Sequence, residues 1–377
     1  MGFTETEKKR RHAAIQELLK AKDLQALLLI GDMNVGHSFH GDFRYYTNNH
    51  IFFQRQVAVV FPGSGPVLFN YSDFSRQASL ERSFVDDCRV STNFIADTVE
   101  LIKAQGASRG RIGVNFEMLP AIWYSYLRTE LANAELVDVH DDIMEIRFQH
   151  SDEEIEVYRK GAALADAGLE AALKVIRPGA SEYEIIAEIE HVSRKQGADE
   201  HFTLIGSGKF AFGDARSLPL PVSPSERTIK AGDSIVMEIT PRYQGYWTQL
   251  VRMVNVGRRN DELEKIQTVA RDAIRRGLEE FKPGKRVKDV ALAMQACIAK
   301  TGFVPRAPFG HVCGIDLVEE RVSLDNERLI VPGFAAIIHP MVHTADGKNL
   351  IFWGETYLAA EDGCERLHRT GDDLLTV

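Results

Sequence analysis

The second half of the chain repeats itself at a fixed distance, and this repeat constrains the fold more than any other feature. One Pro-Gly pair ends at Gly179 and another at Gly284, and each precedes a helix-like stretch that stops at a further glycine, Gly197 or Gly302. Both glycine pairs are 105 residues apart (284 − 179 and 302 − 197). Pro-Gly ends one helix and glycine caps the next, so each copy predicts a helix, a turn and a second helix. We therefore expect two similar α+β halves that face each other and hold a site between them.

Capping boxes mark the starts of two helices in this region. Ser151-Asp-Glu-Glu154 predicts a long helix through Val175, and Ser181-Glu-Tyr-Glu184 predicts a second helix to about residue 196. The remaining pattern predicts helices over 262–281 and 287–300, and strands within 201–256 and 334–358.

The first 145 residues alternate between strand-like and helix-like segments, which indicates an α/β domain. The turn sequence Pro62-Gly-Ser-Gly65 separates two of the strands and is typical of a hairpin. Residues 143–150 are interpreted as a connector, so we expect two domains, over 1–145 and 150–377. The expected helices of the first domain span 6–22, 96–105 and 119–131, and its strands span 26–30, 56–61, 66–71, 111–114 and 136–139.

Five local motifs of the second domain resemble those of the creatinase/prolidase/aminopeptidase P family (M24). They are Gly232-Asp-Ser-Ile-Val-Met-Glu238, Gly245-Tyr-Trp-Thr-Gln-Leu-Val-Arg252, Gly310-His-Val-Cys-Gly314, Pro332-Gly-Phe-Ala-Ala-Ile-Ile-His-Pro340 and Gly354-Glu-Thr-Tyr-Leu-Ala-Ala-Glu-Asp-Gly363. The resemblance implies an α/β N-terminal domain followed by an internally duplicated α+β catalytic domain with the pita-bread fold. It also implies a hydrolase that acts on C–N bonds.

The resemblance further identifies five positions at which the family's peptidases bind two metal ions. These positions hold Asp, Asp, His, Glu and Glu in the family, and Glu238, Gln249, His311, His339 and Gly354 in this chain. Two divalent ions need several carboxylates to offset their charge, and one carboxylate remains. We therefore expect no cofactor and no metal site, as in the metal-free creatinase branch. The alternative is one divalent ion held by Glu238, His311 and His339, for a mononuclear hydrolase or lyase.

Three segments favour the creatinase branch. Phe53-Gln-Arg55 resembles a creatinase Phe-x-Arg whose arginine binds the substrate carboxylate, and His339-Pro-Met-Val342 and Thr248-Gln-Leu-Val-Arg252 resemble two further creatinase motifs. However, no histidine stands near Pro221, where creatinase has its acid/base histidine, and its two glutamate positions hold Val251 and His339.

These departures imply a separate branch with its own catalytic set. The expected substrate is a small molecule with a carboxylate, such as an amidino acid, a cyclic amidine or an N-acyl amino acid. An activity like that of Xaa-Pro peptidases is an alternative. A protein that binds a small acid or a protein partner without catalysis is another. The resemblance also implies a homodimer, in which the N-terminal domain of one subunit brings Arg55 to the neighbouring site.

His311, His339 and Glu238 are the candidate catalytic residues. Imidazole can act as acid and base near neutral pH. His339 and Glu238 each end an apolar strand, where a polar side chain is costly unless it has a partner or a role. Glu238 is expected to orient one of the histidines. The structural alternatives are an ion pair between Glu238 and Arg252, and histidines left over from a metal site.

Other side chains are candidates for substrate binding. Arg55 and Arg321 carry guanidinium groups whose geometry matches a carboxylate, and Gln249 can hydrogen-bond a substrate oxygen. Neighbouring strand residues face opposite ways, so one of Tyr246 and Trp247 is expected to face the site. The remaining candidates are Phe53, His343 and Trp353.

Composition excludes several other functions. The net charge of −9 argues against non-specific nucleic-acid binding. No apolar run approaches the 18 residues of a membrane span. The four cysteines are far apart and form no Cys-x-x-Cys pair, which predicts free thiols and a cytoplasmic protein.

Overall fold

The structure is a computed structural model that describes residues 2–32, 40–50, 55–208 and 221–377. The chain divides into two compact units, Met1–Phe148 and Gln149–Val377. In the described part of the chain no helix has both the length and the apolar character to cross a membrane. Candidate residue Phe53 lies outside the described residues.

The N-terminal unit is a six-stranded sheet in the order β4-β3-β2-β1-β5-β6, with helices on both faces. Strand β1 pairs antiparallel with β2 and parallel with β5. The strands are β1 (Leu24–Gly31), β2 (Gln56–Val60), β3 (Val67–Asn70), β4 (Asp87–Val90), β5 (Arg111–Val114) and β6 (Glu135–Asp138). The helices are α1 (Glu5–Ala21), α2 (Gly41–Thr47), α3 (Asp73–Arg82), α4 (Phe94–Ala104), α5 (Ala121–Glu130) and α6 (His140–Arg147).

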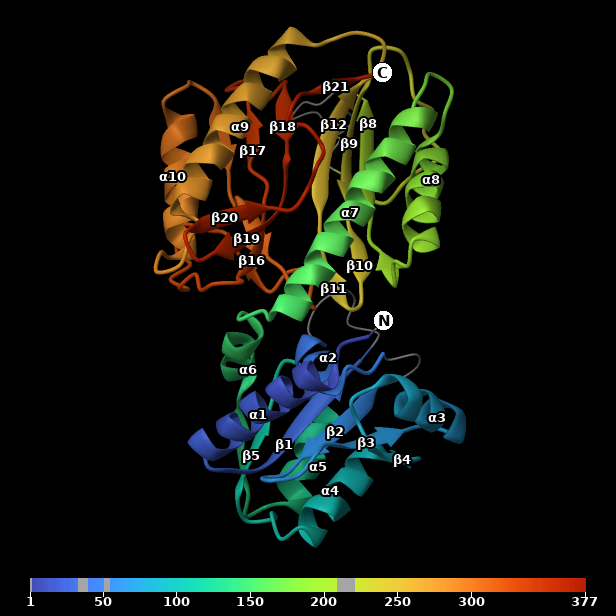
Figure 1. The fold of residues 1–377 in the computed structure, drawn as a ribbon, viewed down its shortest axis with the longest axis vertical. Coiled ribbons are helices and arrows are strands. Elements are labelled where there is room, and N and C mark those ends of the chain that lie inside the picture. Colours follow the sequence, from blue (N-terminus) through green and yellow to red (C-terminus); the bar gives the residue numbers. More distant parts are fainter. Residues whose placement is uncertain (1, 33–39, 51–54, 209–220) are drawn as a thin grey trace. The chain divides into compact units, whose positions relative to one another are not determined.

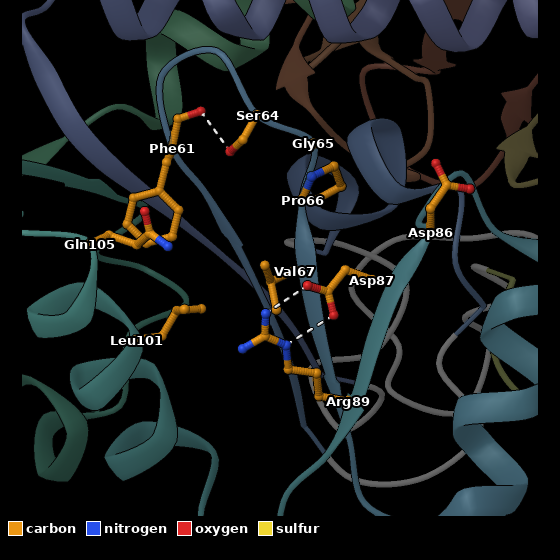
Figure 2. A pocket seen from close by; sticks show the side chains of 10 residues that line it. All are labelled: Phe61, Ser64, Gly65, Pro66, Val67, Asp86, Asp87, Arg89, Leu101 and Gln105. Atoms are coloured by element: carbon orange, nitrogen blue, oxygen red, sulfur yellow. Dashed lines mark hydrogen bonds and ion pairs between the residues drawn. The ribbon is translucent and has the colours of Figure 1, made fainter.

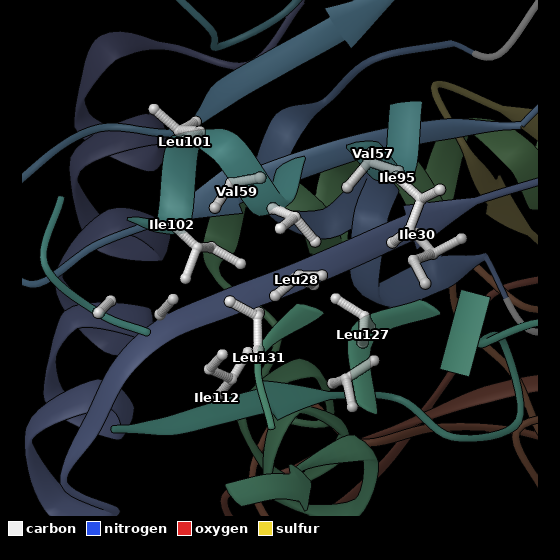
Figure 3. Close-up of a cluster of buried hydrophobic side chains, with 14 of the residues drawn as sticks. Leu28, Ile30, Val57, Val59, Ile95, Leu101, Ile102, Ile112, Leu127 and Leu131 are labelled. Atoms are coloured by element: carbon white, nitrogen blue, oxygen red, sulfur yellow. The ribbon is translucent and has the colours of Figure 1, made fainter. Parts of the chain in front are cut away.

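Strand β1 is apolar on both faces because each face packs against helices. Its alternate residues Leu28 and Ile30 belong to the cluster shown in Figure 3, which includes side chains of α4 and α5. Leu27 and Leu29 point the other way and join a second cluster with residues of α1, α2 and α6. The mixed α/β layering confirms the fold class expected for this part of the chain.

The segment 143–150, interpreted from sequence as a connector, instead contains most of helix α6. Asp141 and Asp142 occupy the first turn of this helix, where acidic side chains favour the helix dipole. Ile143 and Met144 are buried, so burial of two apolar side chains stabilises a helix that the short sequence pattern did not indicate. Helices α2 and α3 and strand β4 also had no counterpart in the sequence prediction.

The C-terminal unit combines two helix pairs with a nine-stranded, largely antiparallel sheet whose main path is β15-β14-β16-β19-β12-β9-β8. The helices are α7 (Asp152–Val175), α8 (Glu182–Lys195), α9 (Asp261–Glu280) and α10 (Val287–Ala299). Strands before α9 are β7 (Glu200–His201), β8 (Leu204–Gly208), β9 (Ser234–Ile239), β10 (Pro241–Tyr243), β11 (Tyr246–Trp247) and β12 (Leu250–Asn255). Strands after α10 are β13 (Val304–Arg306), β14 (Gly310–Val312), β15 (Glu320–Arg321), β16 (Ala335–Ile338), β17 (Met341–His343), β18 (Leu350–Phe352), β19 (Gly354–Ala360), β20 (Gly363–Arg366) and β21 (Leu375–Thr376).

The 105-residue repeat is present in three dimensions. The Gly179 amide donates to the Ile229 carbonyl at 2.9 Å, and the equivalent Gly284 amide donates to the Ile330 carbonyl at 3.0 Å. Figure 1 shows the α7–α8 pair on one side of this unit and the α9–α10 pair on the other, with β9 and β12 between them. Equivalent helix pairs with equivalent anchoring bonds confirm the internally duplicated pita-bread fold.

One face of the large sheet packs against helix α7. Met237 and Ile239 of β9 and Leu250 of β12 belong to a fully buried cluster with Leu169 of α7 and Ile189 of α8. Because strand residues alternate, the neighbours of these apolar side chains point to the opposite face. That opposite face carries the polar residues described next.

Candidate active site

Glu238, Gln249, His311, His339 and Arg321 lie on the same face of the sheet, although they come from five separate segments of sequence. The strand register establishes this arrangement. Glu238 is opposite Val251, Val251 is opposite Gly354, and His311 is opposite both Ile337 and Arg321. Residues directly opposite in a sheet point to the same side, and so do residues two apart along one strand. The structure thus places on one face the four family metal positions that carry polar side chains, namely Glu238, Gln249, His311 and His339.

Glu238 and Gln249 form a hydrogen-bonded pair at the β9–β12 end of this face. The Gln249 amide nitrogen Nε2 donates to Glu238 Oε2 at 2.9 Å. Burial raises the pKa of the Glu238 carboxyl to about 7, because desolvation of the carboxylate outweighs the bond from Gln249. The carboxyl therefore changes its charge near neutral pH, which suits a group that transfers protons.

Gln249 is held in place by the neighbouring strand. The Thr356 hydroxyl accepts a hydrogen bond from the main-chain N–H of Gln249 at 2.8 Å. The main-chain N–H of Thr356 donates to the main-chain carbonyl of Gln249 at 3.1 Å. Both residues are buried. Thr356 was not among the predicted site residues, although its alternation with Gly354 along β19 places it on the same face.

His311 and His339 form a second pair on this face. Their ring centroids are 5.1 Å apart, and the rings meet edge to face. Burial lowers the pKa of His311 to about 4 and that of His339 to about 3, so both imidazoles are neutral at neutral pH. The Nδ1 atom of each ring is buried and, among the described residues, has no hydrogen-bond partner. Each ring therefore has one nitrogen with no hydrogen-bond partner among the described residues.

His339 is held by contacts of both its ring and its main chain. Its ring packs edge to face on Phe352, with centroids 4.9 Å apart, and its amide donates to the Phe309 carbonyl at 2.9 Å. Phe352 is a site residue that the sequence analysis missed. It belongs to an apolar run that is typical of a core strand, and the pairing of β18 with β17, in which Phe352 is opposite Met341, places it near His339.

Arg321 lies at the edge of the cluster, opposite His311 in strand β15. Its side chain is exposed, whereas the neighbouring Glu320 is bound to Arg328 and Asn326. The Arg321 guanidinium forms no ion pair with another described residue, which leaves it available to an anion.

Several other predicted site residues lie away from this face. The Tyr246 hydroxyl donates to the Glu154 carboxylate of α7. Trp353 stacks under the Arg252 guanidinium at 4.4 Å on the helix-covered face, and the neighbouring Glu355 is paired with Arg252. The expected alternative pairing of Arg252 with Glu238 is therefore not formed.

The remaining candidates have structural partners as well. Trp247 is fully buried beside Arg242, at 5.1 Å, and its side chain points away from that of Tyr246. His343 is half-buried and its Nδ1 contacts the Thr344 carbonyl at 2.8 Å. In the N-terminal unit, Arg55 forms an ion pair with Asp32 at 2.5 Å and packs on the Trp123 ring at 5.1 Å.

The described cavities do not coincide with this cluster. The one in Figure 2 has a volume of about 400 Å³ and lies in the N-terminal unit, between the β2–β3 turn and α4. Its most prominent polar contact is the ion pair between Arg89 and Asp87 at 2.6 Å. This ion pair is exposed, and neither of its members belongs to the predicted site.

Comparison with known proteins gives two family matches that together cover most of the chain. Residues 156–361 match the sequence model of metallopeptidase family M24, and residues 11–149 match the creatinase/prolidase N-terminal domain. A creatinase from Bacillus sp. (strain B-0618) is 25% identical over 92% of this chain and 86% of its own length. An Xaa-Pro dipeptidase from Pyrococcus furiosus is 28% identical over 64% of this chain and 69% of its own length.

Solved structures share the fold over nearly the whole chain. An X-Pro aminopeptidase from Thermotoga maritima superposes with a TM-score of 0.84 at 20% identity, over 96% of this chain and 98% of its own. The prolidase from Pyrococcus horikoshii superposes with a TM-score of 0.82 at 22% identity, over 98% of this chain and 100% of its own.

These matches correct the expectation that the protein needs no cofactor. That expectation rested on the loss of carboxylates at the family's metal positions, but the matched family is one of metallopeptidases. Neutral imidazoles such as those of His311 and His339 are themselves good metal ligands, so lost carboxylates do not establish metal independence. In the described residues no three His, Cys, Asp or Glu side chains form a group arranged to hold a metal ion. The described residues thus do not form a complete metal site.

Proposed function

Because the chain belongs to metallopeptidase family M24 and carries the creatinase/prolidase N-terminal domain, we propose that this hydrolase cleaves a C–N bond in a small substrate with a carboxylate. The observation that carries the proposal is the shared sheet face of Glu238, His311 and His339. It combines a carboxyl that titrates near neutral pH with two neutral imidazoles, each of which has an Nδ1 atom without a hydrogen-bond partner among the described residues.

Glu238 is the proton-transfer group in this proposal. In its ionised form it accepts a proton from a water molecule as the water oxygen attacks the carbon of the C–N bond. The same proton then passes to the departing nitrogen, the C–N bond breaks, and Glu238 returns to its ionised form. The hydrogen bond from Gln249 holds Oε2, which leaves Oε1 to act on the water.

His311 and His339 bind and orient the reacting group. A neutral imidazole carries one N–H donor and one acceptor nitrogen, so each ring can hydrogen-bond an oxygen or nitrogen of the substrate. The N–H group of a neutral ring can also donate to the atom of the attacked group on which negative charge develops. Their low pKa values keep them in this form across the neutral range.

Arg321 is the candidate that best fits a substrate carboxylate. It is exposed, it forms no ion pair with another described residue, and it lies opposite His311 on the same face. Arg55, the second candidate, already has a carboxylate partner in Asp32. We therefore assign the carboxylate contact within the subunit to Arg321, because a guanidinium binds a carboxylate with two parallel hydrogen bonds.

The names of the relatives suggest two substrate groups. Creatinase and Xaa-Pro dipeptidase are both among them, and a guanidino acid and a dipeptide both place a carboxylate a short distance from a C–N bond. Xaa-Pro dipeptides are therefore a second candidate class beside amidino acids and N-acyl amino acids.

The proposal is tested by incubating the purified protein with these three classes, with and without added Mn²⁺, and quantifying released amine by mass spectrometry. We expect release from at least one class. We expect Glu238→Gln, His311→Ala and His339→Ala each to reduce kcat by at least about 100-fold. Glu182→Gln, a change to another buried carboxylate of the same unit, is the control and should keep the activity. Turnover that persists in all three variants would show that the chemistry lies elsewhere.

We also propose a homodimer in which Arg55 of one subunit contributes to the site of the other. The support is the creatinase/prolidase N-terminal domain and its resemblance at Phe53-Gln-Arg55. Substrate binding in this arrangement requires Arg55 to exchange Asp32 for the substrate carboxylate. Light scattering tests the dimer directly.

A further inference from the structure

Gly354 stands at a family metal position but contributes no side chain. The structure has no space for a side chain at this position. A Cβ atom added to Gly354 would lie 2.0 Å from the Ile338 carbonyl oxygen, 2.4 Å from His339 Cα and 2.5 Å from His339 Cβ. Heavy atoms that are not bonded to each other do not approach so closely, and two of these three atoms belong to the main chain. Any side chain at position 354 would therefore push the end of strand β16 away from β19.

On its other side, the same end of strand β16 lies close against Gly310 of strand β14. A Cβ atom added there would lie 2.0 Å from the Ile337 carbonyl oxygen and 3.1 Å from Ile338 Cα. Gly310 is the residue before His311, and Gly354 adjoins His339. The peptide units that lead to His339 thus run between two glycines, one on each neighbouring strand.

The segment that carries Gly354 is anchored from the helix-covered face of the sheet. The Arg252 guanidinium, which is fully buried, donates to the Gly354 carbonyl at 3.0 Å and stacks on the Trp353 ring at 4.4 Å. Two residues earlier, Phe352 meets the His339 ring at 4.9 Å. Residues 352–354 thus form a fixed support that His339 contacts through both its main chain and its ring.

We propose that Gly354 is a positioning residue for the reaction: it lets the His339 main chain lie against strand β19, which sets the imidazole edge to face with His311. This inference rests on the proposed catalytic role of His339. A residue larger than glycine at position 354 is incompatible with the observed placement of His339. Gly354 therefore affects the reaction only by fixing where the His339 imidazole lies. Arg252, through Trp353 and the Gly354 carbonyl, holds the support from behind.

The test compares Gly354→Ala with Gly333→Ala at a temperature at which both variants are folded. Gly333 lies just before strand β16, at the far end from His339, and an added Cβ there would lie 2.9 Å from the His150 carbonyl oxygen. It is a matched control because an added Cβ there would also meet the main chain of a neighbouring segment. In addition, its φ of +81° disfavours alanine. Both variants should lose stability.

We expect only Gly354→Ala to lose catalysis. A displacement of about 1 Å at a catalytic group costs about 100-fold in rate, so kcat for the best substrate of the panel should fall by about that factor. KM should change by less than about threefold, since the substrate carboxylate contact is elsewhere. Gly333→Ala should keep kcat within about twofold. A Gly354→Ala enzyme with unchanged kcat, or an equal loss in Gly333→Ala, would overturn the proposal.

A measurement without turnover separates this proposal from the proposed function. Nitrogen-15 NMR of the imidazole rings should show a shifted His339 resonance in Gly354→Ala and an unshifted His343 resonance. If the wild-type protein cleaves nothing, the catalytic proposal fails, but the shift still decides whether Gly354 positions His339. If Gly354→Ala does not fold, Trp353→Leu instead removes the stacking on Arg252 that holds the Gly354 segment and should shift the same resonance. An unshifted His339 in the folded variant contradicts the inference.

Discussion

Replacing Glu238 by glutamine is expected to abolish activity and to stabilise the protein above neutral pH. Burial raises the pKa of this carboxyl from 4.5 to about 7. In the unfolded chain it ionises at its ordinary pKa, so the unfolded state gains stability relative to the native state as the pH rises from about 4.5 to about 7. The native protein therefore loses stability over this window, and the loss is complete above it. Glutamine has nearly the same shape and no charge, so it removes the loss.

The size of the effect follows from the shift in pKa. A difference of about 2.5 pKa units corresponds to about 3 kcal/mol, at about 1.4 kcal/mol for each unit. Glu238 keeps some exposed surface, so we expect about 2 kcal/mol of added stability at pH 8 and almost none at pH 5. Calorimetry of wild type and Glu238→Gln at both pH values, with a chelator present, measures the difference between the two unfolding free energies.

Glu182→Gln is the matched control for this experiment. Glu182 is buried in the same unit, but its carboxylate accepts hydrogen bonds from Ser207 at 2.5 Å and from Ser225 at 2.6 Å. Its replacement disrupts charge-assisted bonds and should destabilise the protein at pH 8. If Glu238→Gln is also destabilised at pH 8, or gains equally at pH 5, then burial does not control the charge of Glu238 and the reasoning is refuted.

Three further results are expected. Because the folded-state pKa values of His311 and His339 are depressed below 6.5, the native protein should lose stability as the pH falls below about 6.5, and urea denaturation should show His339→Asn to be less sensitive to acid. Arg321→Gln should raise KM for a carboxylate substrate by about 10- to 100-fold, but it should not raise KM for the matching amide. Initial rates measure both KM values, and equal changes in the two would exclude the contact. Asp42→Asn should cost about 3 kcal/mol in chemical denaturation because it breaks buried bonds to Arg147 and His140, each 2.7 Å long, and an unchanged midpoint would contradict this.

The dimer remains a prediction with a simple test. Light scattering should give twice the 42.3 kDa of the single chain. A mass of one chain at micromolar concentration would remove the role of Arg55 in a neighbouring site.

The sequence predicted the parts of the fold that depend on local signals. Capping boxes at Ser151 and Ser181 gave the starts of α7 and α8 because a serine side chain and a glutamate three residues later satisfy free amides. The repeat gave the helix pairs because Gly179 and Gly284 end equivalent turns. Helix α6 was missed because its stability comes from packing of Ile143 and Met144, which a short sequence window does not reveal.

The candidate site could be predicted only in part. The family motifs located Glu238, His311 and His339, but their common face depends on register across five strands, which no local pattern encodes. Trp353 and Tyr246 were expected near the substrate, yet each has a partner on the helix-covered side. The titration of Glu238 near neutral pH is likewise a property of burial. It follows from the packing around the strand rather than from the sequence Ile-Val-Met-Glu.

The most direct test of the account is the pH dependence of kcat/KM for the best substrate. If Glu238 is the proton acceptor, kcat/KM should rise with pH to a plateau, with a midpoint near 7. Because the hydrogen bond from Gln249 stabilises the charged carboxylate, Gln249→Leu should move that midpoint upward by about one pH unit. A midpoint that stays in place or moves downward in Gln249→Leu would contradict the assignment of catalysis to this cluster.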